Sequence, residues 1–239
     1  MKLTWLGQVG LLIEANETSI MIDPYLLDTL HQQNGPDFAR LVPTDNRFLE
    51  MRPDMILLTH DHGDHMDLPS LRQLLDTDKQ VQVFAAANAW AKIRFEIGRG
   101  HNYIAAYRGV EWTHKDVHIR AVPAIHSDTS AVGFVIHAEG KTLYITGDTL
   151  YDESVIAAIG EPVDILYIVM NGLGNNMNAA DAARMAAKLQ PKVAVPVHWG
   201  LFEKFSAPPA LFLREAEKWG FRAVQAEIHQ ETTDTELLG

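Results

Sequence analysis

The sequence contains no cysteine among its 239 residues. Disulfide bonds and thiolate metal sites are therefore excluded, and any metal centre must use histidine nitrogens and carboxylate oxygens. No apolar run approaches the roughly 18 residues of a membrane-spanning helix, so we expect no membrane span. The N-terminal stretch MKLTWLGQVGLLIE lacks the long apolar segment and the small-residue cleavage site of a signal peptide. We therefore expect a soluble, cytoplasmic protein.

Positive charge is also scarce. The formal net charge is −11, and the sequence shows no cluster of lysine and arginine. An acidic protein gains nothing from the counterion release that drives binding to nucleic acid, so we expect no nucleic-acid partner. Bound cations would offset part of the negative charge locally. We expect a small-molecule substrate, and the sequence leaves open whether the chain forms a homo-oligomer.

Apolar residues are abundant, at 47% of the chain, which is enough for a sizeable core. Short segments rich in β-branched and apolar residues predict strands at residues 2–7, 10–15, 19–23, 53–60, 81–86, 110–125, 131–140, 142–148, 163–170 and 192–198. Segments with helical spacing predict helices at residues 67–75, 88–98, 151–160, 178–189 and 208–220, with caps that include Asp67, Asn88 and Asn178. No linker divides the chain, so we expect one domain over residues 1–239, of layered α/β type.

A dense group of histidines and aspartates, THDHGDHMD at residues 59–67, follows the apolar run MILL. If the strand continues to this point, His60 and His62 lie on the same side of it and converge on one cation. Asp64 and His65 come after the strand and approach a second cation. These ligand types suit Zn, Mn or Fe. So many candidate ligands at one strand end indicate a metal site rather than a polar turn.

Three other predicted strands also end in a candidate ligand. They end at His126, Asp148 and His198, and Gly147 allows close approach of the backbone next to Asp148. Taken alone, either histidine is equally well explained as a structural residue. Their shared placement favours ligands at one rim of a sheet, with the Asp148 carboxylate as the natural bridge between two sites.

The chain resembles the metallo-β-lactamase-fold hydrolases. The resemblance covers nearly the whole chain and rests on the motif His60-x-His62-x-Asp64-His65 and on the later residues His126, Asp148 and His198. It implies a four-layer αβ/βα sandwich, with two mixed sheets between outer helices, and a site for two divalent metal ions, Zn or Mn, with Fe as an alternative. It also implies the ligand sets: His60, His62 and His126 for the first ion, Asp64, His65 and His198 for the second, and Asp148 as the bridge.

Within that superfamily, the flanking text is most similar to the L-ascorbate-6-phosphate lactonase group. The similar stretches are WLGQVGLLIE, IMIDPYLLD, THDHGDHMD, YITGDTLYDE and NAADAARMAAKLQPKVAVPVHWGLF. The piece HWGLF is also similar to the phospholipase D branch that cleaves N-acyl phosphatidylethanolamines. The chain departs from the lactonase group in being shorter and in carrying His126, where the motif of that group has fewer metal ligands.

The predicted chemistry is hydrolysis. Two cations that share Asp148 can share a water, lower its pKa and direct the metal-bound hydroxide at an ester-type bond. The resemblance favours a lactone, including a sugar-phosphate lactone, and Asp64 and Asp148 are the candidate catalytic residues, with Asp64 relaying a proton to the leaving oxygen. The alternatives are a phosphodiesterase or phospholipase D-like hydrolase, an iron-dependent oxidoreductase of the same fold, a nuclease, which the acidic charge disfavours, and a metal-binding protein without catalysis.

Several residues keep two interpretations. Arg40 and Arg47 either hold a phosphate or carboxylate of the substrate or are ordinary surface residues. Asp23 either orients a ligand histidine, as the resemblance implies, or caps the turn before Pro24. Trp199 belongs to a pocket wall or to the core. Specificity is expected in three loops, at residues 25–47, 127–130 and 171–178, and the remaining histidines are interpreted as structural or surface residues: His31, His101, His114, His118, His137 and His229.

Overall fold

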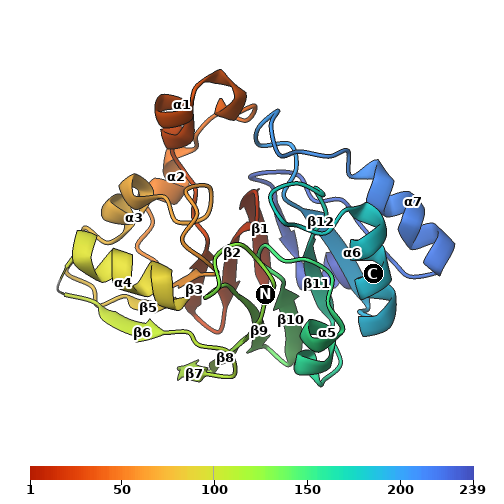
Figure 1. Ribbon diagram of the computed structural model, residues 1–239. Coiled ribbons are helices and arrows are strands. Elements are labelled where there is room, and N and C mark those ends of the chain that lie inside the picture. The colour runs from red at the N-terminus through yellow and green to blue at the C-terminus, as the bar shows by residue number, and fades with distance from the viewer. Residues whose placement is uncertain (99) are drawn as a thin grey trace.

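The computed structural model describes residues 1–98 and 100–239 and contains two β-sheets that pack face to face (Figure 1). The first sheet has the strand order β13-β1-β2-β3-β4-β5-β6. Its strands are β1 (Lys2–Gly7), β2 (Gly10–Ala15), β3 (Thr18–Ile22), β4 (Met55–Leu58), β5 (Gln82–Ala85), β6 (Asn102–Ala105) and β13 (Glu231–Thr233). Pairing is antiparallel from β13 to β3 and parallel from β3 to β6, so this is a mixed sheet.

The second sheet has the order β12-β11-β10-β9-β8-β7 and is also mixed. Its strands are β7 (Glu111–His114), β8 (Val117–Pro123), β9 (Val132–Ala138), β10 (Lys141–Ile145), β11 (Ile165–Val169) and β12 (Val193–Val197). Strands β10, β11 and β12 are parallel to one another. Carboxyl ends of parallel strands meet at one edge of a sheet, which is where ligands bind in such folds.

Helices cover the outer faces of both sheets (Figure 1). The first sheet is flanked by α3 (Leu68–Leu74) and α4 (Ala87–Glu96), and the second by α5 (Glu153–Ile159), α6 (Ala179–Leu189) and α7 (Ala210–Trp219). Shorter elements complete the chain: α1 (Thr29–Asn34), the 3₁₀ turn η1 (Pro36–Phe38), α2 (Asn46–Leu49) and α8 (Asp234–Leu238). The predicted four-layer αβ/βα sandwich is confirmed.

The core between the sheets explains why the layers hold together. Trp5, Phe84 and Phe134 are among its largest buried side chains, and the rings of the two phenylalanines from opposite sheets lie 5.7 Å apart. Two further apolar clusters join each sheet to its own helices. Burial of each such side chain contributes about 1.5–3 kcal/mol. These layers hold the strands that deliver the candidate ligands.

Several sequence predictions differ from the structure at element ends. Helix α4 starts at Ala87 rather than at a cap on Asn88, because the Asn88 amide instead donates to Asp128 Oδ1 at 2.7 Å. Asp67 and Asn178 do cap their helices. The sequence did not predict strands β6 and β13 or helices α1, α2 and α8. Strand β13 comprises only Glu231–Thr233 and gains its order by pairing with β1, which no local pattern signals.

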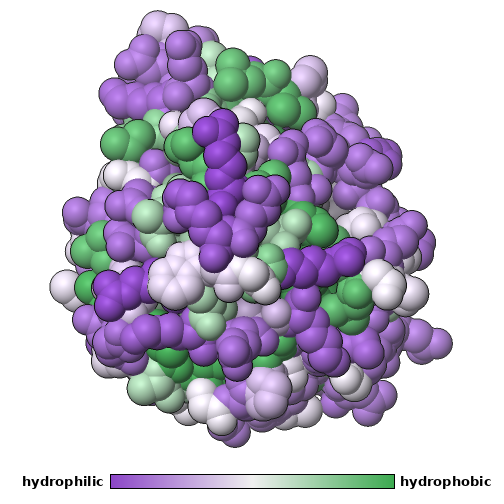
Figure 2. Space-filling model, turned by 90° about the vertical axis from the view of Figure 1, so that its right-hand side faces the viewer, coloured by the Kyte–Doolittle hydropathy of each residue, from purple (hydrophilic) through white to green (hydrophobic). Residues whose placement is uncertain are grey.

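The outer surface over the second helix layer is mostly hydrophilic, with hydrophobic residues scattered over it (Figure 2). This fits helices that pack one apolar face against a sheet and leave the other in water. In residues 1–98 and 100–239, no helix combines the length and the apolar character needed to cross a membrane.

Candidate metal centre

The candidate ligands follow the carboxyl ends of four strands. His60 comes after β4, His126 after β8, Asp148 after β10 and His198 after β12. The backbone at Gly147, next to Asp148, has a φ of +62°, and a Cβ there would lie 3.0 Å from both Thr59 Cβ and Val132 O. Glycine is therefore required at this position, as the sequence predicted, because the turn that presents Asp148 passes directly against the neighbouring chain.

The loop after β4 corrects one part of the sequence interpretation. Strand β4 ends at Leu58, and His60 and His62 lie in irregular chain, so they are not successive inward residues of a strand. They converge nevertheless, with ring centroids 4.5 Å apart. The turn at Asp64 and His65, rather than the strand period, brings the motif together.

The first group of donors consists of His60, His62 and His126. One ligand atom from each lies within 4.8 Å of the others, a spacing that fits a shared cation. Nε2 of His126 is 3.2 Å from Nδ1 of His62. The group spans both sheets, because two members follow β4 and the third follows β8.

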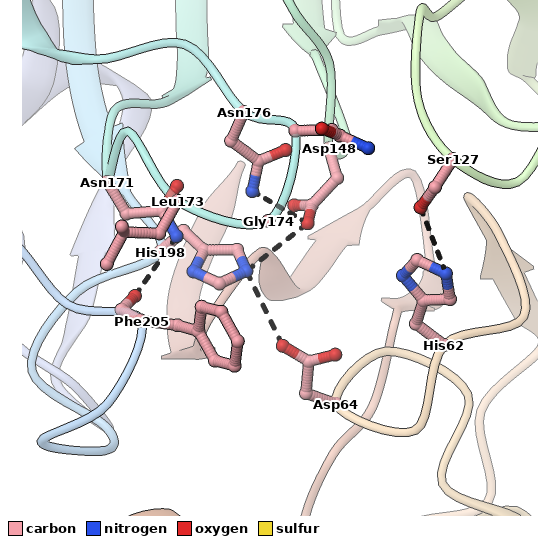
Figure 3. A pocket seen from close by; sticks show the side chains of 11 residues that line it. His62, Asp64, Ser127, Asp148, Asn171, Leu173, Gly174, Asn176, His198 and Phe205 are labelled. Carbon is pink, nitrogen blue, oxygen red and sulfur yellow. Dashed lines mark hydrogen bonds and ion pairs between the residues drawn. The ribbon is translucent and has the colours of Figure 1, made fainter.

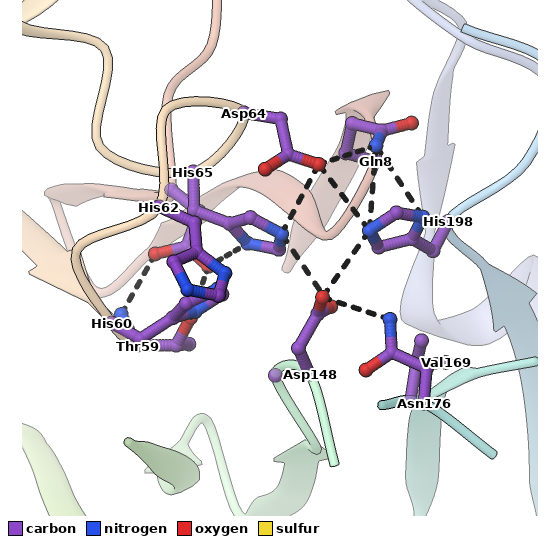
Figure 4. Close-up of polar contacts among 12 residues, drawn as sticks. Gln8, Thr59, His60, His62, Asp64, His65, Asp148, Val169, Asn176 and His198 are labelled. Carbon is purple, nitrogen blue, oxygen red and sulfur yellow. Dashed lines mark hydrogen bonds and ion pairs between the residues drawn. The ribbon is translucent and has the colours of Figure 1, made fainter. Parts of the chain in front are cut away.

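The second group consists of Asp64, His65 and His198, again with one ligand atom from each within 4.8 Å of the others. Oδ2 of Asp64 is 3.7 Å from Nε2 of His65 and 3.5 Å from Nε2 of His198 (Figure 4). His198 has a positive φ of 66°, which is uncommon for histidine, and its N–H donates to the carbonyl of Gln8 at 2.8 Å.

Asp148 lies between the two groups. Its Oδ1 is 3.4 Å from Nε2 of His65, and its Oδ2 is 3.4 Å from Nε2 of His198 and 3.9 Å from Nε2 of His126. The amide of Asn176 donates to the same Oδ2 at 2.8 Å. One carboxylate therefore reaches histidines of both groups, which is the arrangement that a bridging ligand needs.

Asp23 follows β3 and forms hydrogen bonds with residues of the 59–65 motif. It is fully buried and accepts hydrogen bonds from the backbone N–H and the hydroxyl of Thr59, while its Oδ2 is 2.8 Å from Nδ1 of His65. The Thr59 hydroxyl is in turn 2.9 Å from Nδ1 of His60. With Nδ1 occupied in this way, each imidazole presents Nε2 to the centre. The orienting interpretation of Asp23 agrees with these contacts.

Buried polar atoms that lack partners show that this donor set fits metal ions. Within the described residues, Nε2 of His60, Nε2 of His65 and Oδ1 of Asp148 are buried without a hydrogen-bond partner. Most buried polar atoms in proteins are hydrogen-bonded, so three unpaired donor atoms that point to one place indicate a bound ligand. Imidazole nitrogen and carboxylate oxygen without thiolate suit Zn or Mn.

Electrostatics divides the histidines into two kinds. Burial lowers the pKa of His60 and of His126, which keeps both rings neutral. Burial acts in the same direction on His198, but the carboxylates of Asp148 and Asp64 outweigh it and raise the pKa of this histidine to about 9. Burial likewise opposes ionisation of Asp148, but His198 and His65 outweigh it and hold the pKa well below its usual range. Protons and cations therefore compete for the same negative charge.

A pocket opens over this centre (Figure 3). Its walls come from the second and third predicted specificity loops, through Ser127 and residues 171 and 173–176, together with Phe205. None of the lining residues comes from the predicted loop at 25–47. The metal-centre residues that reach the pocket are His62, Asp64, Asp148 and His198.

The two arginines proposed from sequence lie outside this pocket. Arg40 donates to the carbonyls of Tyr25 and Val42, each at 3.0 Å, and stabilises its own loop. Arg47 is exposed and pairs with Asp45 at 2.7 Å. Trp199 packs against Trp5, with ring centroids 4.9 Å apart, so the core interpretation is confirmed.

Sequence reasoning missed Gln8 and Phe205, and it placed Asn176 in a specificity loop without assigning it a contact to Asp148. Gln8 donates to Asp64 Oδ2, Asn176 donates to Asp148, and the ring of Phe205 forms part of the wall. Gln8 and Asn176 are neutral and carry no metal-ligand signal. The only sequence cue is position, because Gln8 stands between two glycines in the turn after β1 and Asn176 lies in the run NGLGNNMN.

Comparison with known proteins shows the family of the chain. The family profile of the beta-lactamase superfamily domain matches residues 18–199, and the chain belongs to that superfamily. Among curated proteins, it is 27% identical to a UPF0173 metal-dependent hydrolase from Methanopyrus kandleri over 92% of this chain and 93% of the relative. A second UPF0173 metal-dependent hydrolase, from Staphylococcus carnosus, is also 27% identical, over 91% and 94% of the two chains.

Among solved structures, Igni18, a metallo hydrolase from Ignicoccus hospitalis, has a similar fold. Its TM-score is 0.77 at 22% identity, and the match covers 97% of both chains. The family and the names of the relatives identify this chain as a metal-dependent hydrolase. The resemblance to ascorbate-6-phosphate lactonases stays a prediction.

Proposed function

We propose that the protein hydrolyses an ester-type bond, with a lactone as the favoured substrate class, and that it does so with two divalent ions, Zn or Mn. The observation that carries the proposal is the pair of three-donor groups with Asp148 between them, beneath a pocket open to solvent. Seven candidate ligands exceed what one tetrahedral ion needs.

In this proposal each group holds one ion. His60, His62 and His126 would hold the first ion and Asp64, His65 and His198 the second, and Asp148 would offer a carboxylate oxygen to each. When bound, such ions supply a water of lowered pKa and polarise the electrophile. Asp23 keeps His65 turned towards the centre. The chain's own contribution is to orient these donors through the contacts of Asp23, Thr59 and Gln8 with their side chains.

Asp64 is the proposed proton carrier. Its side chain lines the pocket, is ionised because His65 and His198 outweigh the effect of burial on its pKa, and accepts from Gln8 at 2.8 Å. A carboxylate in this position accepts a proton at the reacting centre and passes it to the leaving oxygen. The lactone preference rests on the resemblance of the flanking sequence, and a cytoplasmic location is proposed with it.

A hydrolysis screen tests the proposal. Protein loaded with Mn or with Zn is assayed on matched lactones, simple esters and phosphodiesters, with the Asp148→Asn protein as the blank. We expect turnover of at least one lactone above every phosphodiester, and a loss of that turnover in the blank. Phosphodiester turnover well above every lactone would replace the lactonase proposal by the phosphodiesterase alternative.

A further inference from the structure

We propose that the site takes a substrate whose body is uncharged and partly apolar, without a phosphate or carboxylate remote from the bond that is cleaved. The inference rests on the proposed hydrolysis and deepens it. It excludes phosphorylated lactones in favour of neutral ones. Three features of the pocket carry it: the chemistry of its polar wall, the contacts of the nearby arginine and lysine side chains, and its apolar residues.

The polar wall is neutral. Outside the candidate ligands, the polar side chains that line the pocket are Ser127, Asn171, Asn175 and Asn176, and within the described residues no lysine or arginine lines it. Proteins recognise phosphate and carboxylate groups with arginine, lysine or free backbone N–H groups. The polar wall offers hydrogen bonds but no positive charge.

The helix that follows this wall offers no anion site either. Asn178 caps α6, and its Oδ1 accepts from the N–H groups of Ala180 and Asp181, each at 3.0 Å. The first turn also contains the carboxylate of Asp181. These two N–H groups are already satisfied by the cap and are not available to an anion.

Lys204 is the cation that precedes Phe205, and its charge has other partners. Its ammonium lies 3.5 Å from Oδ2 of Asp37 and 5.2 Å from the centre of the Phe38 ring. It does not line the pocket over the metal centre. The Lys204 ammonium is also 5.9 Å from the centre of the Phe205 ring, behind the pocket wall rather than in its lining. Arg40 and Arg47 form contacts within their own loop and do not line the pocket.

The pocket also has an apolar part, formed by Leu173, in the same loop as Asn171, and by Phe205. Leu173 is 47% exposed at the pocket, and Phe205 lines the pocket beside it. Phe205 has a positive φ of 58°, and its carbonyl accepts from the Asn171 amide at 3.0 Å (Figure 3). A non-glycine residue held in this conformation next to a site is a feature of ligand-contacting loops. The backbone of Phe205 is thus held by Asn171, and its ring offers an apolar surface to the body of a substrate.

Charge balance leads to the same conclusion. The proposed cations compensate negative charge at the reacting group, at the pocket floor. A second anionic group farther out would lose water against Leu173 and Phe205 without gaining a counter-charge. A neutral ring or acyl chain loses nothing by the same burial and gains from it.

The test compares two inert ligands that differ in one group. A lactam analogue of a neutral lactone and the same lactam with a remote phosphate are titrated into Mn-loaded protein by calorimetry. We expect the neutral lactam to bind at least about tenfold more tightly, a factor that corresponds to about 1.4 kcal/mol. Equal or tighter binding of the phosphorylated lactam would overturn the inference, and so would a failure of both to bind.

Matched variants locate the effect. Leu173→Lys places a cation at the pocket, Leu173→Gln removes the apolar surface without adding charge, and Leu211→Lys adds the same charge on α7, where residue 211 does not line the pocket. We expect Leu173→Lys to shift the binding ratio towards the phosphorylated lactam by about tenfold. Leu173→Gln should shift it less, and Leu211→Lys should leave it unchanged. An unchanged ratio in Leu173→Lys would overturn the inference.

The experiments distinguish a failure of the proposed lactone hydrolysis from a failure of the inference about substrate charge. If neither parent lactone is hydrolysed while the neutral lactam binds preferentially, the lactonase proposal fails and the inference about charge stands. If the phosphorylated lactone is the better substrate and its lactam the better ligand, the inference fails and the proposed hydrolysis stands.

Discussion

The side-chain amide nitrogen of Gln8 lies 2.8 Å from Oδ2 of Asp64 and 3.3 Å from both ring nitrogens of His198. Gln8 is buried, with a positive φ of 47°, and its carbonyl also accepts from the backbone of His198. One neutral residue in the turn after β1 therefore holds two candidate ligands that are far apart in sequence.

Gln8→Ala is expected to weaken metal binding by about 10–100-fold, the usual effect of losing a residue that orients a ligand. The fold should persist, because the apolar layers do not involve this amide. Competition with a chelating dye measures the affinity. The matched control is Gln73→Ala on the exposed face of α3, which should bind as the parent does. Parental affinity in Gln8→Ala would show that the contact does not position Asp64.

Metal occupancy is the second prediction. Purified protein supplied with Mn or Zn should hold close to two ions per chain, as elemental analysis can determine. Metal should also raise the unfolding free energy, by about 2.7 kcal/mol at a free concentration one hundred times the Kd. Removal of the ions with a chelator should reverse this stabilisation. At most one ion under saturating supply would rule out a bridge at Asp148.

Asp148→Asn is expected to reduce both metal content and kcat, the latter by about a hundredfold or more, because an amide is a poorer ligand and removes one negative charge between the cations. Circular dichroism, metal analysis and turnover on one active substrate test this together. The matched control is Asp152→Asn, since Asp152 caps α5 by accepting from Ser154 N–H at 2.7 Å and asparagine caps helices equally well. A folded Asp148→Asn protein with full metal and parental turnover would contradict the assignment.

Asp54 provides a prediction about stability and pH away from the centre. Burial opposes its ionisation, but hydrogen bonds from the N–H and hydroxyl of Ser19 outweigh burial and lower its pKa. A pKa lowered by folding stabilises the protein above the unfolded value of about 3.9, and this stabilisation is lost as the pH falls. Asp54→Asn should therefore cost about 1 kcal/mol at neutral pH and less in acid.

Denaturant unfolding at pH 7 and at about pH 3 measures the difference. Asp76→Asn serves as the control, because Asp76 is exposed on the loop after α3. It should change stability little at either pH. A cost at Asp54 that stays the same in acid would show that ionisation of this carboxyl does not contribute.

The sequence by itself determined the layered fold and the seven candidate ligands. Several apolar runs end in histidine or aspartate, as at His60, Asp148 and His198. Apolar runs of this kind are typical of strands buried between layers, so their polar ends mark the edge of a sheet where a site can form. The helix cap at Asp67 was also predictable, because capping depends on residues close together in the sequence. That one domain spans residues 1–239 and that Asp148 bridges two ions remain predictions.

Only the tertiary structure decided how the motif converges and what surrounds it. His60 and His62 meet through an irregular loop rather than through strand alternation. Gln8 and Asn176 reach the carboxylates because distant strands end at one edge, and a neutral amide gives no signal in a sequence. The sequence permits a substrate role for Arg40, but its guanidinium donates to carbonyls of its own loop. Local residue chemistry can be read along the chain, whereas contacts between segments far apart in sequence depend on how the layers pack.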